Sequence, residues 1–359
     1  MLSKLPINLL SDQEHFFNKY RKIESSNLEI KQLKNVFVNQ QGLVLKNGLL
    51  VDGCAFNLKG SMDNTFYYSF WRNLIEQYLV CKFGKSLKSI SLDDDKNYLL
   101  IHSAWFNYSF WVNSFLIRLI SAIKANGVTN LCLIYPEEWN FIPYVKESLT
   151  YFDIPFHIVP KDHHLFVKNL VMPKTRKWTN SFDKLTIRYV YDWFSFLKPS
   201  EKPFRRIYLT RKKRNVRCVE NELALIDILK KYDFEIIAFE ELTFIEQVQT
   251  MMHTSVFVSI HGAGFSNMIF MQPKSIVFEL INYEYAKMEY TFPFWKLADS
   301  LDLDYYYQFG YVNNIEQFNL IKNNKYELNQ KYLVNQNIDI ELEIFEDNIN
   351  TILSNSYFK

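Results

Sequence analysis

The densest group of side chains suited to ligand binding is a basic segment, residues 202–217, which contains eight Lys or Arg and no acid. An apolar run over 206–210 predicts a buried strand that ends directly before Arg211, and Arg217 closes the segment. Open α/β sheets bind ligands beyond the C-terminal ends of their strands, and guanidinium groups bind phosphate oxygens in pairs. The pattern therefore predicts a site for a phosphate-bearing ligand, with a solvated surface for nucleic acid or anionic lipid as the alternative.

A glycine-rich turn follows a second predicted buried strand, over 256–260, and consists of His261, Gly262, Ala263 and Gly264. A helix is predicted to begin there, and glycine lets backbone N–H groups approach an anion at the positive end of a helix. The side chain of His261 adds a donor for a phosphate or sugar oxygen. The turn is typical of a diphosphate cradle, although a core histidine beside a structural turn has the same short pattern.

An acid, Glu279, lies near the end of the next predicted strand, over 275–280, at the same edge of the sheet as His261. A carboxylate in this position commonly accepts hydrogen bonds from a ribose diol, and a capping or ion-paired surface acid is the alternative. With the basic segment and the glycine-rich turn, Glu279 predicts a nucleotide site in which arginines and a helix N-terminus hold a diphosphate.

Two further groups of residues have some features of a metal site. Asp93–Asp95 contains the D-x-D form that can bind Mg²⁺ or Mn²⁺, but it precedes its predicted strand, as a solvated turn does. The pair His163 and His164 has no third ligand at helical spacing. We therefore expect neither a metal nor a cofactor.

The elements that position these residues alternate between short apolar runs and helical periods, which is the sequence form of an α/β fold with parallel sheets. We predict a first domain over 1–198, a second over 199–335, and a helix within 336–359 whose apolar residues need a surface to cover. The predicted strands are 35–38, 43–45, 49–51, 98–103, 129–135, 155–160, 206–210, 235–239, 256–260 and 275–280, and the predicted helices are 111–126, 136–151, 178–197, 219–232, 244–252 and 264–270.

The composition is that of a globular protein, because 48% of the 359 residues are hydrophobic, 22% are charged, and the net charge is only +2. These values exclude a disordered acidic tail and a polycation. The four cysteines form no C-x-x-C pair, and no apolar run reaches the ~18 residues that a membrane helix needs. We expect a cytoplasmic protein whose clustered basic residues allow peripheral contact with an anionic membrane.

Taken in order, these residues resemble the C-terminal half of glycosyltransferase family 61, with weaker similarity upstream at Asn107–Trp111. The resemblance implies a GT-B fold, in which two Rossmann-like domains face a cleft and a C-terminal helix crosses back to the first domain. It also implies inversion at the anomeric carbon without a metal, with Asn107 and Trp111 on the acceptor side. The residues that it assigns to the binding of a UDP-sugar donor are Arg211, Arg217, Asn221, Glu222, His261, Gly262, Ala263, Gly264, Asn267 and Glu279.

One position departs from the pattern of the family. Phe110 stands where members usually carry a histidine directly before the tryptophan. An inverting displacement needs a base for the proton of the acceptor hydroxyl, and phenylalanine cannot take that proton. His102, at the predicted end of a strand of the first domain, is the leading candidate for this base, followed by Asp52 and Asp63, and a structural role is the alternative for His102.

We therefore predict an inverting, metal-independent hexosyl- or pentosyltransferase that moves a sugar from a UDP-sugar to a hydroxyl of a glycan. The expected acceptor is a bacterial surface glycan of lipopolysaccharide or capsule type, free or linked to a lipid. A catalytically inactive nucleotide-sugar-binding module is one alternative, and it accounts for Phe110. A polyanion-binding protein is a weaker one, because the net charge is small and no nucleic-acid motif is present.

Overall fold

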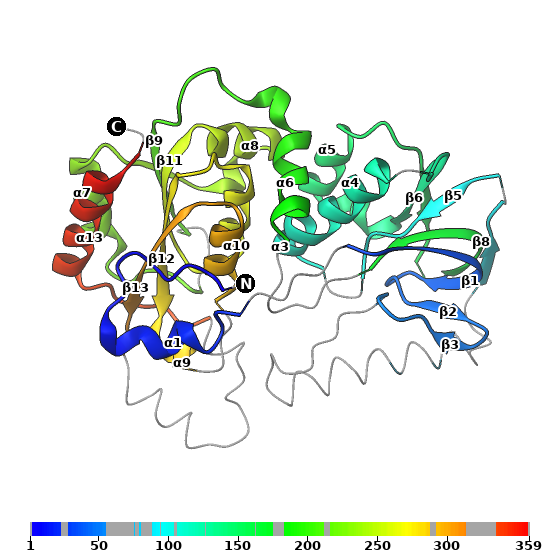
Figure 1. Ribbon diagram of the computed structural model, residues 1–359, viewed down its shortest axis with the longest axis horizontal. Coiled ribbons are helices and arrows are strands. Elements are labelled where there is room, and N and C mark those ends of the chain that lie inside the picture. The colour runs from blue at the N-terminus through cyan, green and yellow to red at the C-terminus, as the bar shows by residue number, and fades with distance from the viewer. Residues whose placement is uncertain are drawn as a thin grey trace.

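The computed structural model describes residues 2–22, 28–54, 75, 79, 88–93, 95–103, 106–125, 127–161, 163–174, 183–211, 216–287, 292–313 and 335–357. Two β-sheets with helices between and outside them form its framework (Figure 1). The chain is therefore a mixed α/β protein, as the alternation of apolar runs and helical periods predicts.

The first sheet is mixed rather than wholly parallel. Its strands are β1 (Ile30–Asn39), β2 (Val44–Lys46), β3 (Leu49–Leu50), β4 (Lys88–Ser91), β5 (Asn97–Leu99), β6 (Leu131–Pro136), β7 (Phe156–Val159) and β8 (His163–Pro173). They run in the order β3-β2-β1-β8-β5-β6-β7, and β4 also pairs with β8. Strand β8 is antiparallel to β1 but parallel to β4 and β5. This central strand was missing from the sequence prediction, because polar residues interrupt its apolar run.

Helical segments cover the side of the first sheet that faces the second one (Figure 1). They are α3 (Tyr108–Phe110), η2 (Trp111–Phe115), α4 (Leu116–Lys124), η3 (Glu137–Phe141), α5 (Pro143–Leu149), α6 (Lys184–Trp193) and η4 (Ser195–Leu197). The first three form one continuous helical stretch whose middle, η2, is π-helical. This stretch confirms the helix predicted over 111–126.

The second sheet is parallel throughout, in the order β10-β9-β11-β12-β13. Its strands are β9 (Arg205–Leu209), β10 (Glu235–Ile237), β11 (Thr254–Ile260), β12 (Ile276–Asn282) and β13 (Asp304–Gly310). The helical segments of this half are α7 (Glu222–Lys231), η5 (Phe239–Glu241), α8 (Phe244–Met252), η6 (Ala263–Phe270), α9 (Tyr283–Lys287) and α10 (Pro293–Ser300). Every element predicted here is present, although the segment after the glycine-rich turn, η6, is a 3₁₀ helix, and η5, α9, α10 and β13 are additional.

The terminal helix α13 (Leu342–Asn355) packs on the second sheet and not on the first half, so the predicted crossing back is wrong. Its apolar stripe, which includes Phe345 and Ile349, joins a buried cluster with Phe278 of β12. The rings of Phe345 and Phe278 are stacked with centroids 5.6 Å apart. Together with α7, this helix covers the outer face of the sheet, and that face supplies the apolar surface that the stripe needs (Figure 1).

The N-terminal segment, with η1 (Ser11–Gln13) and α1 (Glu14–Asn18), also packs on the second half, although the prediction placed it in the first domain. The ring of Phe17 lies 5.1 Å from that of Trp295 and 4.8 Å from that of Tyr307. Sequence periodicity identifies apolar residues but not the sheet that they cover. The packing of the N-terminal segment on the second half could therefore not be predicted from it.

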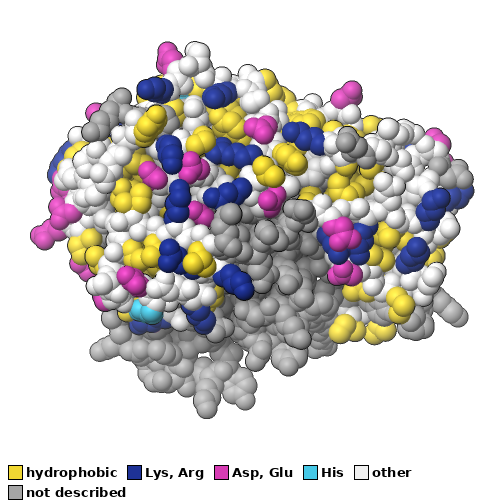
Figure 2. Space-filling view, in the orientation of Figure 1, with side chains coloured by type: hydrophobic (Ala, Val, Ile, Leu, Met, Phe, Trp, Pro, Cys, Tyr) yellow, Lys and Arg dark blue, Asp and Glu magenta, His cyan; other side chains and the backbone are white. Residues whose placement is uncertain are grey.

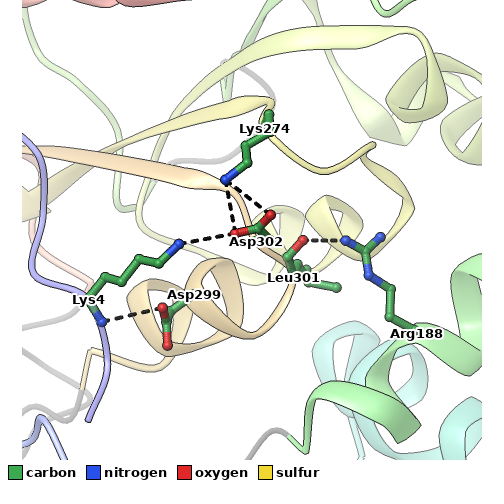
Figure 3. A network of polar contacts seen from close by, with 6 residues as sticks. All are labelled: Lys4, Arg188, Lys274, Asp299, Leu301 and Asp302. Atoms are coloured by element: carbon green, nitrogen blue, oxygen red, sulfur yellow. Dashed lines mark hydrogen bonds and ion pairs between the residues drawn. The ribbon is translucent and has the colours of Figure 1, made fainter. Parts of the chain in front are cut away.

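Polar contacts near Asp302 join three parts of the chain (Figure 3). Lys4 and Lys274 bind the Asp302 carboxylate, with Nζ–O distances of 3.1 and 3.2 Å, and Arg188 of α6 donates to the carbonyl of Leu301. The lysine–carboxylate pairs are largely exposed, so each contributes at most about 1 kcal/mol. The burial of Phe17 and its neighbours is therefore the main attachment of the N-terminal segment.

The two halves share one continuous core. A single buried cluster contains Trp111 and Phe115 of the first half together with Phe265 and Phe270 of η6. Helix η6 contacts α3, η2 and α6, and α5 contacts α8. The helix that follows the glycine-rich turn is therefore fixed from both halves. Among the described helices, none combines the length and apolarity that crossing a membrane requires.

Candidate functional site

Three of the sequence-predicted ligand residues, Arg211, His261 and Glu279, lie at the C-terminal ends of three neighbouring strands. Strands β9, β11 and β12 are parallel, and Ser259 of β11 pairs with Leu209 on one side and Glu279 on the other. Arg211, just after the end of β9, therefore lies beside His261, just after the end of β11. This edge is where open α/β sheets bind ligands.

Two guanidinium groups converge on the backbone of Gly262. A Cβ placed on Gly262 would lie 2.3 Å from Nη1 of Arg211 and 3.8 Å from Nη1 of Arg217. The φ of Gly262 is 171°, which is extended backbone open to any residue, so glycine is needed here for space. At Gly264 an added Cβ would lie 2.4 Å from Cδ2 of Leu209, so this second glycine lets η6 pack against β9.

The position of Arg217 is fixed by a distant part of the chain. Its φ of +59° is left-handed, a conformation that costs a non-glycine residue about 1–2 kcal/mol. Its backbone N–H donates to the carbonyl of Asn335 at 3.1 Å, and its guanidinium donates to Oδ1 of Asn335 at 3.0 Å. The neighbouring N–H of Cys218 donates to Oδ1 of Asn337 at 2.9 Å. These two asparagines are contributors that sequence reasoning missed.

Glu279 holds His261 and does not present a carboxylate to a ribose. Its side chain is completely buried, with Oε1 2.5 Å from Nδ1 of His261. Its other oxygen accepts a hydrogen bond from the hydroxyl of Tyr305 at 2.6 Å. This arrangement does not support the expected ribose contact, because the Glu279 side chain is completely buried and both of its oxygens bind protein side chains. Since a carboxylate only accepts hydrogen bonds, Nδ1 of His261 carries a proton.

The surroundings of His261 keep the ring neutral near pH 7. Burial lowers the pKa of His261 below its usual range, Arg217 and Arg211 act in the same direction, and Glu279 opposes them. Two aromatic rings enclose the imidazole, with centroids 5.7 Å away for Tyr285 and 5.1 Å for Phe294. The result is an enclosed polar edge with two fixed cations and one imidazole, which suits an anionic ligand.

Asn221 and Glu222 form hydrogen bonds within the protein, and the partners of Glu222 lie next to the strand end that carries Arg211. The side chain of Asn221 donates to the carbonyl of Ile340 at 2.7 Å and accepts from its N–H at 3.1 Å. Glu222 accepts from the hydroxyls of Tyr208 at 2.9 Å and Thr210 at 2.8 Å. These contacts fix the end of β9, and neither side chain joins the group around Gly262.

Asn267 lies at the junction of the two halves rather than at the cation-lined edge. It is fully buried, and its amide oxygen accepts a hydrogen bond from the hydroxyl of Tyr108 at 2.5 Å. Its Nδ2 donates to Oε1 of Gln247 at 3.2 Å. Alongside, Asn113 of η2 donates to Ser266 at 3.0 Å. Asn267 therefore holds η6 against the first half.

The residues expected on the acceptor side have local structural contacts. Asn107 caps its helix, because its side chain accepts a hydrogen bond from the N–H of Phe110 at 3.0 Å. Trp111 is completely buried and donates from Nε1 to Oγ of Ser148 at 2.9 Å. An acceptor has no access to Trp111 in this structure.

His102 has the contacts of a structural histidine. Only 3% of it is exposed, and its Nε2 lies 3.0 Å from the carbonyl oxygen of Gln40. Burial, helped by Arg118, lowers the pKa of His102 to about 3. A base this weak and this enclosed is poorly suited to take a proton from an acceptor hydroxyl.

Of the two carboxylates proposed as alternative bases, the structure describes Asp52 but not Asp63. The side chain of Asp52 is 81% exposed and forms ion pairs with Lys174 at 3.0 Å and Lys31 at 3.6 Å. A hydrogen bond from Lys174 lowers the pKa of Asp52, which weakens it as a base. Asp63 lies outside the described residues.

Metal ligands are not gathered within the part of the chain that the structure describes. No group of three or more His, Cys, Asp or Glu side chains lies close enough to hold an ion there. Asp93 and Asp95 are exposed, and His163 hydrogen-bonds through Nδ1 to the carbonyl of Lys161 at 2.8 Å.

Tyr305, Tyr285 and Phe294 surround His261 and Glu279, yet the sequence argument did not find them. Tyr305 belongs to β13, and the run Asp304–Phe309 carried a detectable strand signal in its repeated aromatic residues. Tyr285 and Phe294 come from short helices with no motif of their own. Only the fold brings them to the end of β11.

The fold and this edge define an α/β protein in which two arginines and a histidine lie together at the strand ends of a parallel sheet. Residues 108–278 match the family model described as glycosyltransferase 61, so the resemblance predicted from the sequence is confirmed and the chain carries a glycosyltransferase family 61 region. This stretch includes the glycine-rich turn, both arginines and the helix that begins at Tyr108.

Similar proteins carry a related name. The chain is 33% identical over 89 residues to EGF domain-specific O-linked N-acetylglucosamine transferase of Drosophila melanogaster, which is 24% of this chain and 17% of that protein. The proteins of the same name from Rattus norvegicus and Pan troglodytes are 30% and 29% identical over 84 residues, 22% of this chain and 16% of theirs. The chain thus aligns with about a sixth of the length of these relatives. With the family match, they support its assignment as a glycosyltransferase.

Proposed function

We propose that this chain is a glycosyltransferase that takes a sugar from a UDP-sugar donor held at the Gly262 edge and transfers it to a hydroxyl of a glycan. We propose that the two α/β halves form a GT-B arrangement, with the donor on the second half. The observation that carries this proposal is the convergence of Arg211 and Arg217 beside the backbone of Gly262, at the C-terminal ends of β9 and β11.

The chemistry follows from these cations. Breaking the bond between sugar and diphosphate leaves negative charge on the departing diphosphate. Fixed donors aimed at that charge lower the barrier, and they are most effective in an enclosed site. Arg211 and Arg217 supply this stabilisation from the protein itself, which is why we propose a transfer that needs no metal. The inversion at the anomeric carbon that we propose is what the resemblance to glycosyltransferase family 61 implies. Of the described candidates for the base that takes the acceptor proton, neither the buried His102 nor the ion-paired Asp52 is well suited to this role.

The names of the relatives suggest the first donor to test. They are described as N-acetylglucosamine transferases, so UDP-N-acetylglucosamine is our first candidate. For the acceptor we propose a surface glycan of lipopolysaccharide or capsule type, with the enzyme in the cytoplasm and in peripheral contact with an anionic membrane. The basic segment 202–217 is the part of the chain that suits such contact.

Thermal-shift and calorimetric titrations with UDP, CMP, GDP and UDP-N-acetylglucosamine, with and without EDTA, test the donor site. A ligand that binds only the folded state raises the melting temperature according to its affinity. We expect selective, EDTA-insensitive stabilisation by the uridine nucleotides that Arg211→Ala and His261→Ala abolish. The matched control is Lys202→Ala, an exposed cation of the same basic segment, which should keep the wild-type response. Stabilisation that all three variants retain would contradict the proposal.

Two alternatives give different results. A catalytically inactive nucleotide-sugar-binding module would show the same binding but no transfer to any glycan acceptor. A polyanion-binding protein would bind oligonucleotides with a steep salt dependence and without competition by UDP. The face drawn in Figure 2 disfavours this second alternative, because its Lys and Arg side chains are interspersed with Asp and Glu.

A further inference from the structure

Among the three cationic or potentially cationic side chains beside Gly262, only His261 changes its charge near neutral pH. Arg211 and Arg217 keep theirs at every pH that the protein tolerates. An imidazole has an ordinary pKa close to 6.5, so a modest change in its surroundings decides whether it carries a proton at pH 7.

Charged and titratable groups face His261 from every element that packs against it. Glu279 of β12 binds Nδ1 at 2.5 Å, and Tyr305 of β13 fixes that carboxylate from the other side at 2.6 Å. Tyr285 of α9 lies over the ring, and burial raises the pKa of Tyr285, so its hydroxyl stays neutral. Arg211 and Arg217 supply the opposing positive charge.

An arriving diphosphate changes this balance in one direction. In the ligand-free protein burial disfavours a proton on His261, the two guanidinium groups act in the same direction, and together they outweigh Glu279. A diphosphate bound to the guanidinium groups offsets their positive charge and adds negative charge of its own. Negative charge within about 4–6 Å raises the pKa of a histidine. The imidazole therefore becomes easier to protonate in the complex.

We propose that binding of a sugar-nucleotide diphosphate at the proposed donor site is coupled to the uptake of a proton by His261. Glu279 holds the proton that Nδ1 already carries, so the incoming proton, taken from solvent, binds Nε2. The departing diphosphate then meets three cations instead of two, and the proton returns to solvent when the diphosphate leaves. Glu279 and Tyr305 act as positioning residues, because they select which ring nitrogen receives the proton.

Calorimetry in two buffers of widely different ionisation enthalpy measures proton uptake directly. UDP-N-acetylglucosamine is the main probe, because its diphosphate is esterified at both ends and exchanges no proton near neutral pH. UDP is run in parallel. We expect the binding heat between pH 6 and 8 to depend on the buffer, in the direction of proton uptake, and affinity to fall as the pH rises through this range. His261→Gln should bind more weakly and show no uptake.

Two variants make the result specific. His253→Gln removes another histidine, which hydrogen-bonds the carbonyl of Gln249, and should keep the wild-type uptake. Glu279→Gln keeps hydrogen-bonding capacity next to His261 but removes the charge, so the uptake profile should move to lower pH. A purely structural role of Glu279 predicts weaker folding without that movement.

The outcomes separate this inference from the proposed function on which it rests. Binding of UDP-N-acetylglucosamine without proton uptake, or with the same uptake in His261→Gln, overturns the coupling but leaves the donor site standing. If neither ligand binds the wild-type protein, the proposed donor site itself fails and the coupling fails with it.

Discussion

Substitution of Gly262 by alanine should damage ligand binding while leaving the fold intact. The added Cβ would lie 2.3 Å from Nη1 of Arg211, whereas non-bonded heavy atoms settle near 3.5 Å, so the guanidinium must move by about 1 Å. The backbone itself accepts alanine, because φ is 171°. The strain therefore falls on the end of a flexible side chain and not on the core.

The expected magnitude follows from the hydrogen bonds that this movement breaks. A hydrogen bond to a charged group contributes about 1.5–3 kcal/mol, and a displacement of about 1 Å takes it out of bonding range. The affinity for UDP should fall about 10- to 100-fold. The free energy of unfolding should change by less than about 0.5 kcal/mol, as for a substitution without a core contact. Calorimetry with UDP and urea unfolding measure the two quantities.

A second glycine provides the matched control. An added Cβ on Gly127 meets nothing within 4 Å, but its φ is +81°, which strains any residue with a side chain. Gly127→Ala should therefore cost about 1 kcal/mol of stability and leave the affinity for UDP unchanged. Wild-type affinity in folded Gly262→Ala would refute the argument that Arg211 reaches across this glycine to the ligand.

Three further predictions concern stability, which urea unfolding measures. Tyr305→Phe removes the donor to the buried carboxylate of Glu279 and should cost about 1.5–3 kcal/mol; a loss within error would mean that the 2.6 Å contact contributes nothing. Glu147→Gln removes the charge that accepts the first N–H groups of α8 across the junction and should cost about 1 kcal/mol, more at low salt than at high salt. His102 has a pKa of about 3 when folded against about 6.5 unfolded, so the unfolded chain binds more protons between these values and stability falls as the pH drops from 6.5 towards 3. His102→Gln should remove up to about 1.4 kcal/mol per pH unit of that slope, and an unchanged slope would contradict the burial of a neutral ring.

The second half was predictable from sequence because its elements are short, regular and bounded by clear signals. Apolar runs predicted β9, β11 and β12. Arg211, two residues after β9, and His261, directly after β11, do lie together at one edge. The strands of a parallel sheet all end at the same edge, which leaves little freedom in where the residues after them lie. The ligand edge followed from that regularity.

The contacts of individual side chains could not be predicted in the same way. Glu279 has the right place on its strand for a ribose ligand, but its neighbours Tyr305 and His261 take both of its oxygens. Asn267 has a place in the family pattern, yet it faces Tyr108 of the other half. The sequence pattern determines where a residue lies along its strand or helix. The hydrogen-bond partner of its side chain depends on which other element packs against that strand or helix.

The prediction placed both ends of the chain on the wrong half for a related reason. The apolar stripe around Phe345 and the ring of Phe17 were detectable as surfaces that need covering. Two sheets were available to cover them, and periodicity does not distinguish one apolar surface from another. Strand β8 was missed because polar residues such as Lys168 and Asn169 interrupt a strand that lies at the centre of its sheet.

The most direct test of the donor site is a crystal structure of this chain with bound UDP. We expect diphosphate oxygens within hydrogen-bonding distance of the guanidinium groups of Arg211 and Arg217 and of Nε2 of His261, with Glu279 still bound to His261 and Tyr305. A diphosphate elsewhere on the molecule, or a ribose bound directly by Glu279, would contradict it.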